Sequence, residues 1–159
     1  MKMKFGFSLI ELMVVVAIIA FLAMISVPSF TKYLAKAKRA EVFMQLSSLY
    51  AAQKAYWAEH GHYSTQLSGQ DSVGWQPAGY AGGGSGEKFY YTYGFSGSEG
   101  QNYCTGKLGT SSSYFSGAYA DDSGFLAYAA GDVSKSGIPD IWSVDQNNNI
   151  INVQDGLGS

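Results

Sequence analysis

An uncharged apolar run near the N-terminus constrains everything that this chain can become. No residue from Leu12 to Phe30 is charged, and Leu, Ile, Val, Ala, Met and Phe fill nearly every position. That length fits the ~20 apolar residues with which a helix crosses a bilayer. Glu11 stands at the start of the run, where an ionised carboxylate costs on the order of 2.5–3.5 kcal/mol. The run therefore predicts a membrane helix whose acid needs a partner, and we expect none within the helix itself.

The residues before the run differ from an ordinary secretory signal. Such a signal has an apolar segment of ~7–15 residues with its cleavage site after that segment. Here the apolar run is longer, and the small residue at a plausible cleavage site, Gly6, precedes it. Cleavage after Gly6 would remove Lys2 and Lys4 and leave the helix on a mature chain that begins at Phe7. The new ammonium group could neutralise Glu11 of the same chain, or more easily that of a neighbouring chain stacked with an axial offset.

The segment Lys4 to Ala20, with the sequence KFGFSLIELMVVVAIIA, resembles the signature of the type IV pilin family and its pseudopilin relatives. The resemblance implies cleavage by prepilin peptidase between Gly6 and Phe7, N-methylation of Phe7 and storage in the bacterial inner membrane. It also implies that Glu11 neutralises the terminal amine of an adjacent subunit in a filament. Pro28 matches the family's helix-interrupting proline, near which the helix can melt or bend in the assembled fibre. A single-pass anchor is the plain alternative for the run, and a tolerated kink is the plain alternative for Pro28.

Length and charge limit the rest of the chain. Beyond the membrane helix, the 159-residue sequence leaves room for one small globular domain. Loss of the leader would leave eight basic against twelve acidic residues, a balance that does not indicate a nucleic-acid surface. We expect a leader at 1–6, a transmembrane or filament-core helix at 7–30, an amphipathic continuation at 31–60 and a globular head at 61–159.

A basic cluster follows the apolar run and leaves the membrane orientation open from charge alone. Its members are Lys32, Lys36, Lys38 and Arg39. The cluster is compatible with an anchor on the cytoplasmic side, with a solvated helix face beside Glu41, or with contacts between filament subunits. The family resemblance implies a cytoplasmic N-terminus and an exported head.

Apolar residues resume at helical spacing beyond Pro28. The stripe consists of Val42, Leu46, Leu49, Gln53 and Tyr56, flanked at seven-residue intervals by Phe43, Tyr50 and Trp57. This pattern predicts a helix that packs on a core and ends near His60, where Gly61 can adopt a left-handed C-terminal conformation.

The remainder predicts an irregular loop followed by strands. The loop is expected at 68–86, with Trp75 and Tyr80 as anchors, and the last two strands are expected to form a hairpin across 145–149. Strands are expected at 88–95, 113–119, 124–130, 141–144 and 150–153. The predicted fold class is α+β, with one long N-terminal helix packed on a small antiparallel sheet, and the family resemblance implies the same fold.

Motifs for catalysis and metal binding are weak. The glycine-rich run 82–88 lacks the ending of a phosphate-binding loop, and His60 and His62 flank a glycine without the further ligands typical of zinc. No Ser/His/Asp set can be assembled, so the sequence does not indicate an enzyme, and no cofactor is expected. The oxygen-rich segment with Asp132, Asp140 and Asp145 leaves calcium open as a cofactor, although the spacing matches no EF-hand.

Cys104 is the single cysteine, so the chain cannot close the internal disulfide that many pilins carry. A lone cysteine in an exported protein is either a buried apolar filler or a reactive thiol. We expect burial.

The sequence thus predicts a structural subunit of a type IV pilus filament that serves adhesion, twitching motility or DNA uptake. The expected partners are other pilin subunits, prepilin peptidase, the inner-membrane assembly platform and the membrane. The expected locations are the inner membrane before assembly and the extracellular filament afterwards. A minor pilin or type II secretion pseudopilin, and a membrane-anchored binding module that never polymerises, remain alternatives. Electron transport along aromatic residues is a further alternative, although core packing explains those residues sufficiently.

Overall fold

The structure, a computed structural model, describes residues 6–157 and all side chains in that range except that of Pro28. The chain divides into two compact units, with the boundary between Leu34 and Ala35. One helix, α1 at Leu9–His60, belongs to the first unit by its N-terminal part and to the second by its C-terminal part.

The first unit consists of a short non-helical segment followed by the apolar part of α1. Every residue from Gly6 to Leu34 is exposed, Pro28 being left out of this comparison. By length and composition, α1 is the one helix among the described residues that could cross a membrane. The backbone of α1 continues in helical form through residue 28. The melting or bending predicted for an assembled fibre stays a prediction.

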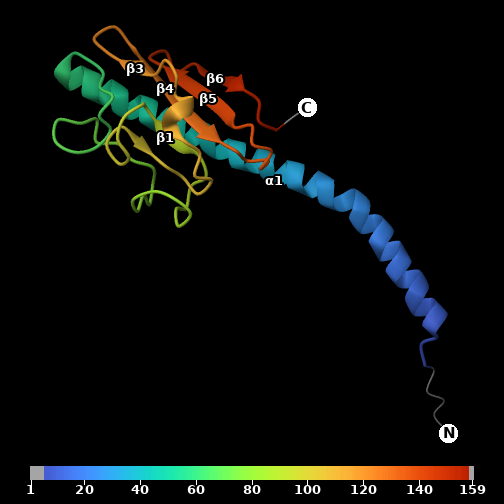
Figure 1. Cartoon of the computed structure of the whole chain (residues 1–159). Helices are drawn as coiled ribbons and strands as arrows, with labels where there is room; N and C mark the ends of the chain where they lie inside the picture. Colours follow the sequence, from blue (N-terminus) through green and yellow to red (C-terminus); the bar gives the residue numbers. More distant parts are fainter. Residues whose placement is uncertain (1–5, 158–159) are drawn as a thin grey trace. The chain divides into compact units, whose positions relative to one another are not determined.

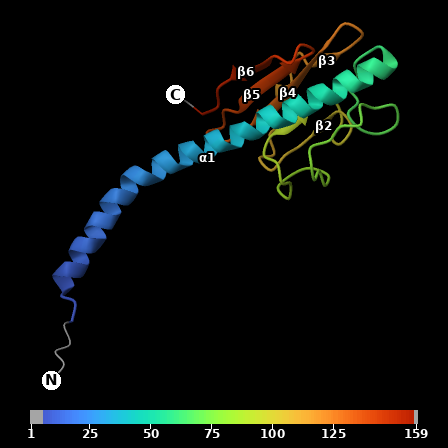
Figure 2. The same cartoon turned by 180° about the vertical axis from the view of Figure 1, so that it is seen from behind.

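The second unit packs the rest of α1 on an antiparallel sheet, which Figures 1 and 2 show from opposite sides. The strand order is β2-β1-β4-β5-β6, and β3 pairs with β4 beside that path. The strands are β1 at Thr92–Gly94, β2 at Tyr103–Cys104, β3 at Tyr119–Ala120, β4 at Phe125–Gly131, β5 at Asp140–Asp145 and β6 at Ile150–Gln154. The predicted α+β fold class is therefore confirmed.

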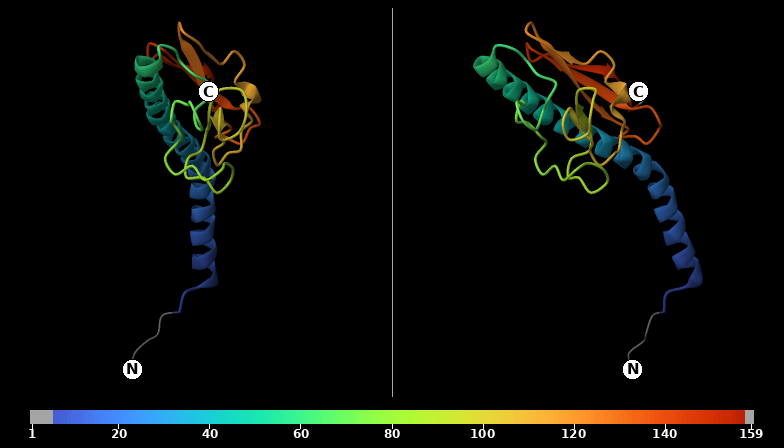
Figure 3. Two further views of the ribbon diagram at one scale, coloured as in Figure 1. Left: turned by 90° about the vertical axis from the view of Figure 1, so that its left-hand side faces the viewer. Right: turned by 60° about the vertical axis from the view of Figure 1, so that its left-hand side comes forward.

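The core lies between α1 and one face of the sheet, along which the helix runs in both views of Figure 3. All five members of the predicted helix stripe are buried, whereas the flanking row is only partly covered, with Phe43 and Trp57 close to half exposed. Alternation along β4 places Phe125, Ala127 and Ala129 in this core. Its intervening residues face a smaller cluster on the other side, where Phe115 is fully buried.

The end of α1 follows the predicted chemistry. Gly61 has φ +77°, and its N–H donates to the carbonyl of Trp57 at 2.8 Å. Just beyond it, buried Gln53 donates to and accepts from the backbone of Ser64, at 2.6 and 3.2 Å. The chain after Gly61 therefore turns back along the helix, and the buried side-chain amide of Gln53 is paired on both its nitrogen and its oxygen.

The strands predicted at 124–130, 141–144 and 150–153 are confirmed as β4, β5 and β6, whereas the earlier strand predictions are mostly wrong. Of the strand predicted at 113–119, only Tyr119 lies in a strand, β3. The preceding residues form a short 3₁₀ helix, Ser112–Tyr114, and a turn, and the Ser111 side chain caps the helix by accepting from the N–H of Ser113. The strand expected at 88–95 shrinks to β1, and β2 was not predicted. The predicted hairpin is confirmed: β5 and β6 pair antiparallel, and the Asp145 carboxylate accepts from the N–H groups of Asn147 and Asn149 in the turn.

A buried ion pair connects the C-terminal segment to α1. Asp140 is fully buried, and Arg39 donates to both of its oxygens, at 2.9 and 2.6 Å, and also to Asp155. Tyr91 and Trp142 add hydrogen bonds of 2.8 and 2.7 Å to the same carboxylate. The interpretation of Arg39 as part of a solvated helix face is wrong, because a residue 101 positions away supplies its counter-charge.

Glu41, expected beside that solvated face, is also engaged in the head. Its carboxylate accepts from the N–H of Tyr90 at 2.9 Å and from the hydroxyl of Tyr93 at 2.8 Å. It therefore ties α1 to the segment that leads into β1.

Cys104 is buried, as predicted. Burial raises the pKa of its thiol to about 12, and the negative charges of Glu99 and Glu87 add to this effect. A protonated, enclosed thiol acts as an apolar filler and has little nucleophilic character at neutral pH.

Candidate functional site

The start of α1 is organised by a reciprocal contact between Ser8 and Glu11. The N–H and the hydroxyl of Ser8 donate to Glu11 Oε2 at 2.9 and 2.7 Å, and the N–H of Glu11 donates to Ser8 Oγ at 3.3 Å. This is a capping box, in which Ser and an acid three residues later satisfy each other's free amides at a helix start. These hydrogen bonds explain why α1 begins at Leu9, directly after Ser8.

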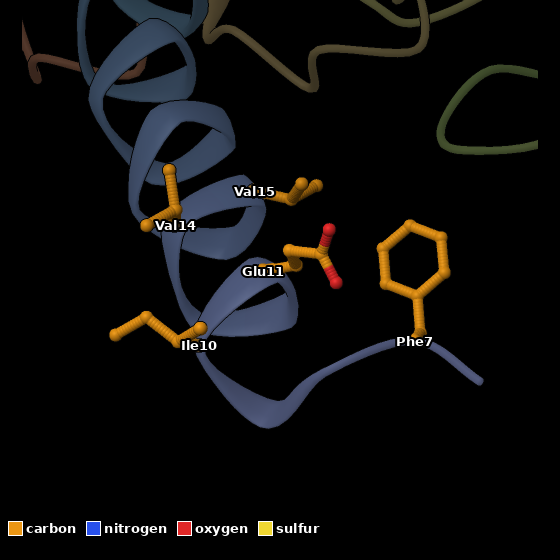
Figure 4. A pocket seen from close by; sticks show the side chains of 5 residues that line it. All are labelled: Phe7, Ile10, Glu11, Val14 and Val15. Atoms are coloured by element: carbon orange, nitrogen blue, oxygen red, sulfur yellow. The ribbon is translucent and has the colours of Figure 1, made fainter. Parts of the chain in front are cut away.

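Apolar side chains surround the Glu11 carboxylate. A shallow surface pocket is lined by Phe7, Ile10, Glu11, Val14 and Val15. The side chains of Glu11 and Val15 are four residues apart and therefore neighbours on one helix face. Figure 4 shows the Glu11 carboxylate on the side of the helix where the Phe7 ring lies.

The contacts of Glu11 leave one of its oxygens available. Both hydrogen bonds from Ser8 go to Oε2, and among the described residues no donor bonds to Oε1. No Lys, Arg or His within the described range forms an ion pair with this carboxylate. The arrangement can thus accept an additional cationic N–H donor against an apolar background.

Ser8 is the functional residue that the sequence reasoning missed. From the sequence, Glu11 is expected to have no partner within its own helix, yet Ser8 at the N-cap donates to it twice. The signal was present as Ser8-Leu9-Ile10-Glu11, the S-x-x-E pattern of a capping box directly before an apolar run.

The predicted processing site lies in the non-helical segment before α1. Gly6 and Phe7 are both exposed, and a Cβ added to Gly6 would meet no atom within 4 Å. Packing among the described residues therefore does not require glycine at this position. The remaining leader residues, including Lys2 and Lys4, lie outside the described residues, and cleavage and methylation stay predictions.

The three candidate calcium ligands occupy separate environments. Asp140 lies in the Arg39 ion pair, Asp145 caps the hairpin turn, and Asp132 accepts from the N–H groups of Ser136 and Gly137. In the described part of the chain, no three His, Cys, Asp or Glu side chains form a group that could hold a metal ion. The structure does not bring these three carboxylates together, and calcium binding there stays an untested prediction.

Comparison with known proteins points to one family. Residues 1–27 match the family model described as the prokaryotic N-terminal methylation motif. The type IV major pilin protein PilA of Myxococcus xanthus (strain DK1622) is 51% identical over 59 residues, which cover 37% of this chain and 27% of the relative. The fimbrial protein EcpB of Eikenella corrodens is 44% identical over 68 residues, covering 43% of this chain and 42% of that protein.

A third relative is the type IV major pilin protein PilE1 of Neisseria gonorrhoeae, 36% identical over 58 residues, which cover 36% of this chain and 35% of the relative. These matches confirm the predicted resemblance to type IV pilins over the N-terminal part of the chain. The chain spans less than half the length of each of these three relatives.

Proposed function

We propose that this chain is the structural subunit of a type IV pilus filament, assembled through its N-terminal helix from a pool in the bacterial inner membrane. The observation that carries this proposal is the first unit, an apolar helix with one acid at its start and no cover from the described residues. The relatives named type IV major pilins support the same reading.

The exposed apolar surface explains why such a helix lies either in lipid or among the helices of other subunits. The large apolar side chains of the first unit are 45–79% exposed, from Val15 in the helix to Phe7 just before it. Burial of apolar surface contributes roughly 25 cal/mol per Å², so water is an unfavourable surrounding for all of them. Lipid covers this surface in the membrane pool, and helices of neighbouring subunits cover it in the filament.

Glu11 then guides assembly. Cleavage between Gly6 and Phe7 by prepilin peptidase, followed by N-methylation of Phe7, creates a cationic amine at the start of the helix. The free Oε1 of Glu11 accepts a hydrogen bond from that amine of a neighbouring subunit, while Ser8 continues to donate to Oε2. The assembly platform of the inner membrane inserts subunits from the pool, and the exported head determines what the filament touches, in adhesion, motility or DNA uptake.

The test replaces Glu11 by alanine in the native host. We expect the Glu11→Ala subunit to accumulate in the membrane at the normal level and to be missing from filaments sheared off the cells. Glu59→Ala is the matched control, because Glu59 is an exposed acid near the other end of α1, and it should leave the filament yield unchanged.

The same experiment separates the alternatives. Abundant filaments that contain the Glu11→Ala subunit would contradict the proposed role of Glu11 in assembly. A wild-type subunit that stays in the membrane and is absent from the sheared fraction would favour a membrane-anchored binding module that never polymerises. A wild-type subunit that occurs only in trace amounts in the sheared fraction would indicate a minor pilin or a pseudopilin.

A further inference from the structure

The loop between α1 and β1 contains a buried carboxylate with one unpartnered oxygen. Glu87 is only 4% exposed. Its Oε1 accepts from the N–H groups of Ala81 and Gly83, both at 2.8 Å, which folds the loop over it. Its Oε2 is fully enclosed and has no hydrogen-bond partner among residues 6–157, and burying an unpaired charged oxygen is costly.

A second carboxylate lies against the same loop. Glu99 Oε1 accepts from the N–H of Thr105 at 2.8 Å and from the hydroxyl of Tyr80 at 3.2 Å, and Oε2 accepts from the Thr105 hydroxyl. The two segments are further joined by a backbone hydrogen bond of 3.2 Å from Gly84 to Thr105.

Gly83 stands between the two carboxylates. Its N–H binds Glu87, and a Cβ built on it would lie 2.5 Å from Glu99 Oε1. The φ of Gly83, +91°, lies in the left-handed region that favours glycine. The two acids are therefore neighbours across one glycine, although they are twelve positions apart in the sequence.

Within residues 6–157 no lysine, arginine or histidine forms an ion pair with either carboxylate, since the ion pairs there join Arg39 to Asp140 and Asp155. The pKa of neighbouring Tyr80 responds to burial and to both carboxylates. Burial raises the pKa of Tyr80, and the negative charges of Glu99 and Glu87 raise it further. A buried carboxylate oxygen without a donor, such as Glu87 Oε2, is unfavourable unless a cation compensates it.

We propose that Glu87 and Glu99 bind a divalent, oxygen-preferring cation of the calcium class, which clamps the loop at 79–87 onto the turn at 99–105. Calcium accepts 6–8 oxygen ligands, including backbone carbonyls and water. The described side chains supply no third acid for this site, so we expect carbonyl groups and water to complete the shell. This site is separate from Asp132, Asp140 and Asp145, and it does not depend on filament assembly.

The test is terbium luminescence on the full processed chain in detergent micelles. Terbium is an oxygen-seeking ion of similar size to calcium, and Tyr80 beside the site can sensitise its emission. We expect saturable emission with one site per chain that calcium chloride displaces, with a calcium Kd of about 10⁻⁴–10⁻³ M, as in extracellular modules.

The matched variants are Glu87→Gln and Glu99→Gln, which keep the side-chain shape and remove one charge each. Each should weaken terbium binding at least tenfold, while Asp132→Asn and Asp145→Asn should leave it within twofold of the wild type. Circular dichroism checks that each variant is folded. Because Glu99 is exposed, Glu99→Gln remains informative even if Glu87→Gln does not fold.

Two results would overturn the proposal. One is a wild-type chain without saturable terbium emission and without heat of calcium binding in calorimetry. The other is binding that survives Glu99→Gln unchanged and is lost in Asp132→Asn or Asp145→Asn, which would place the cation at the C-terminal candidates instead.

Discussion

Asp140 is the residue on which three separate segments of the second unit converge. It is bound by Arg39 from α1, by Tyr91 from the start of the sheet, and by Asn152 and the N–H of Gly156 from the C-terminal segment. Burial acts to raise the pKa of Asp140, but the hydrogen bonds from Arg39, Trp142, Tyr91 and Gly156 together lower it below 3.8. A chain with a single cysteine thus fastens its C-terminal segment by charge and hydrogen bonding.

Replacing this carboxylate should be among the most destabilising single changes in the head. Asp140→Asn keeps the size of the side chain but leaves Arg39 without its buried counter-charge, and breaking a buried pair in this way costs on the order of 3 kcal/mol. Urea unfolding of the detergent-solubilised chain, followed by tryptophan fluorescence, measures the loss. Asp122→Asn, at an exposed acid, is the control, and an equal loss in both variants would contradict this role for Asp140.

The same carboxylate makes the head sensitive to acid. Because its pKa is lower in the folded than in the unfolded chain, its contribution to stability is present above about pH 3.8 and is lost as the pH falls through the folded value. We expect the urea concentration at the unfolding midpoint of the wild type to decrease as the pH is lowered below 3.8. The midpoint of Asp140→Asn should change less over the same pH range. A parallel drop in both proteins would show that other carboxylates dominate the acid response.

At the scale of elements, the C-terminal end of α1 depends on the backbone freedom of Gly61. Its φ of +77° lies in the left-handed region, although a Cβ there would meet nothing within 4 Å. Gly61→Ala should therefore destabilise the head by about 1–2 kcal/mol through backbone strain alone.

Gly86 provides the matched control. A Cβ there also meets nothing, and its φ is not in the left-handed region, so Gly86→Ala should be neutral or slightly stabilising. Thermal unfolding of both variants by circular dichroism makes the comparison. Equal melting temperatures would contradict the claim that backbone conformation, and not packing, selects glycine at the helix end.

The elements show what a sequence can predict. The helix stripe and the C-terminal hairpin were predictable, because their signals are local: apolar spacing, Gly61 after the last turn, and asparagines between two apolar segments. The short pairing of β1 with β2 was not, because it consists of a few residues held by long-range contacts. The Arg39–Asp140 pair was equally beyond reach, since no local signal relates residues 101 positions apart.

The candidate site at the start of α1 was more predictable from the sequence than the strands and the buried ion pair of the second unit. Gly6, Phe7 and Glu11 all follow from one contiguous motif, and the S-x-x-E pattern would also have identified Ser8. The acids at the loop between α1 and β1 could not be found this way, because folding alone brings Glu87 and Glu99 to either side of Gly83.

At the scale of the whole molecule, the two units differ in the surfaces that they expose. The second unit has its own apolar core, whereas the first unit exposes an apolar helix for which water is an unfavourable surrounding. This division is what the proposed function requires: a helix for storage and assembly, and a head for the outer surface.

Intact-mass spectrometry of filaments sheared from the surface of the native host tests this account most directly. The proposed function predicts an abundant species that begins at N-methylated Phe7, because in that proposal processing between Gly6 and Phe7 precedes assembly. A chain that still carries Met1 and the rest of the leader, or one that is missing from the sheared filaments while present in the membrane, would contradict it.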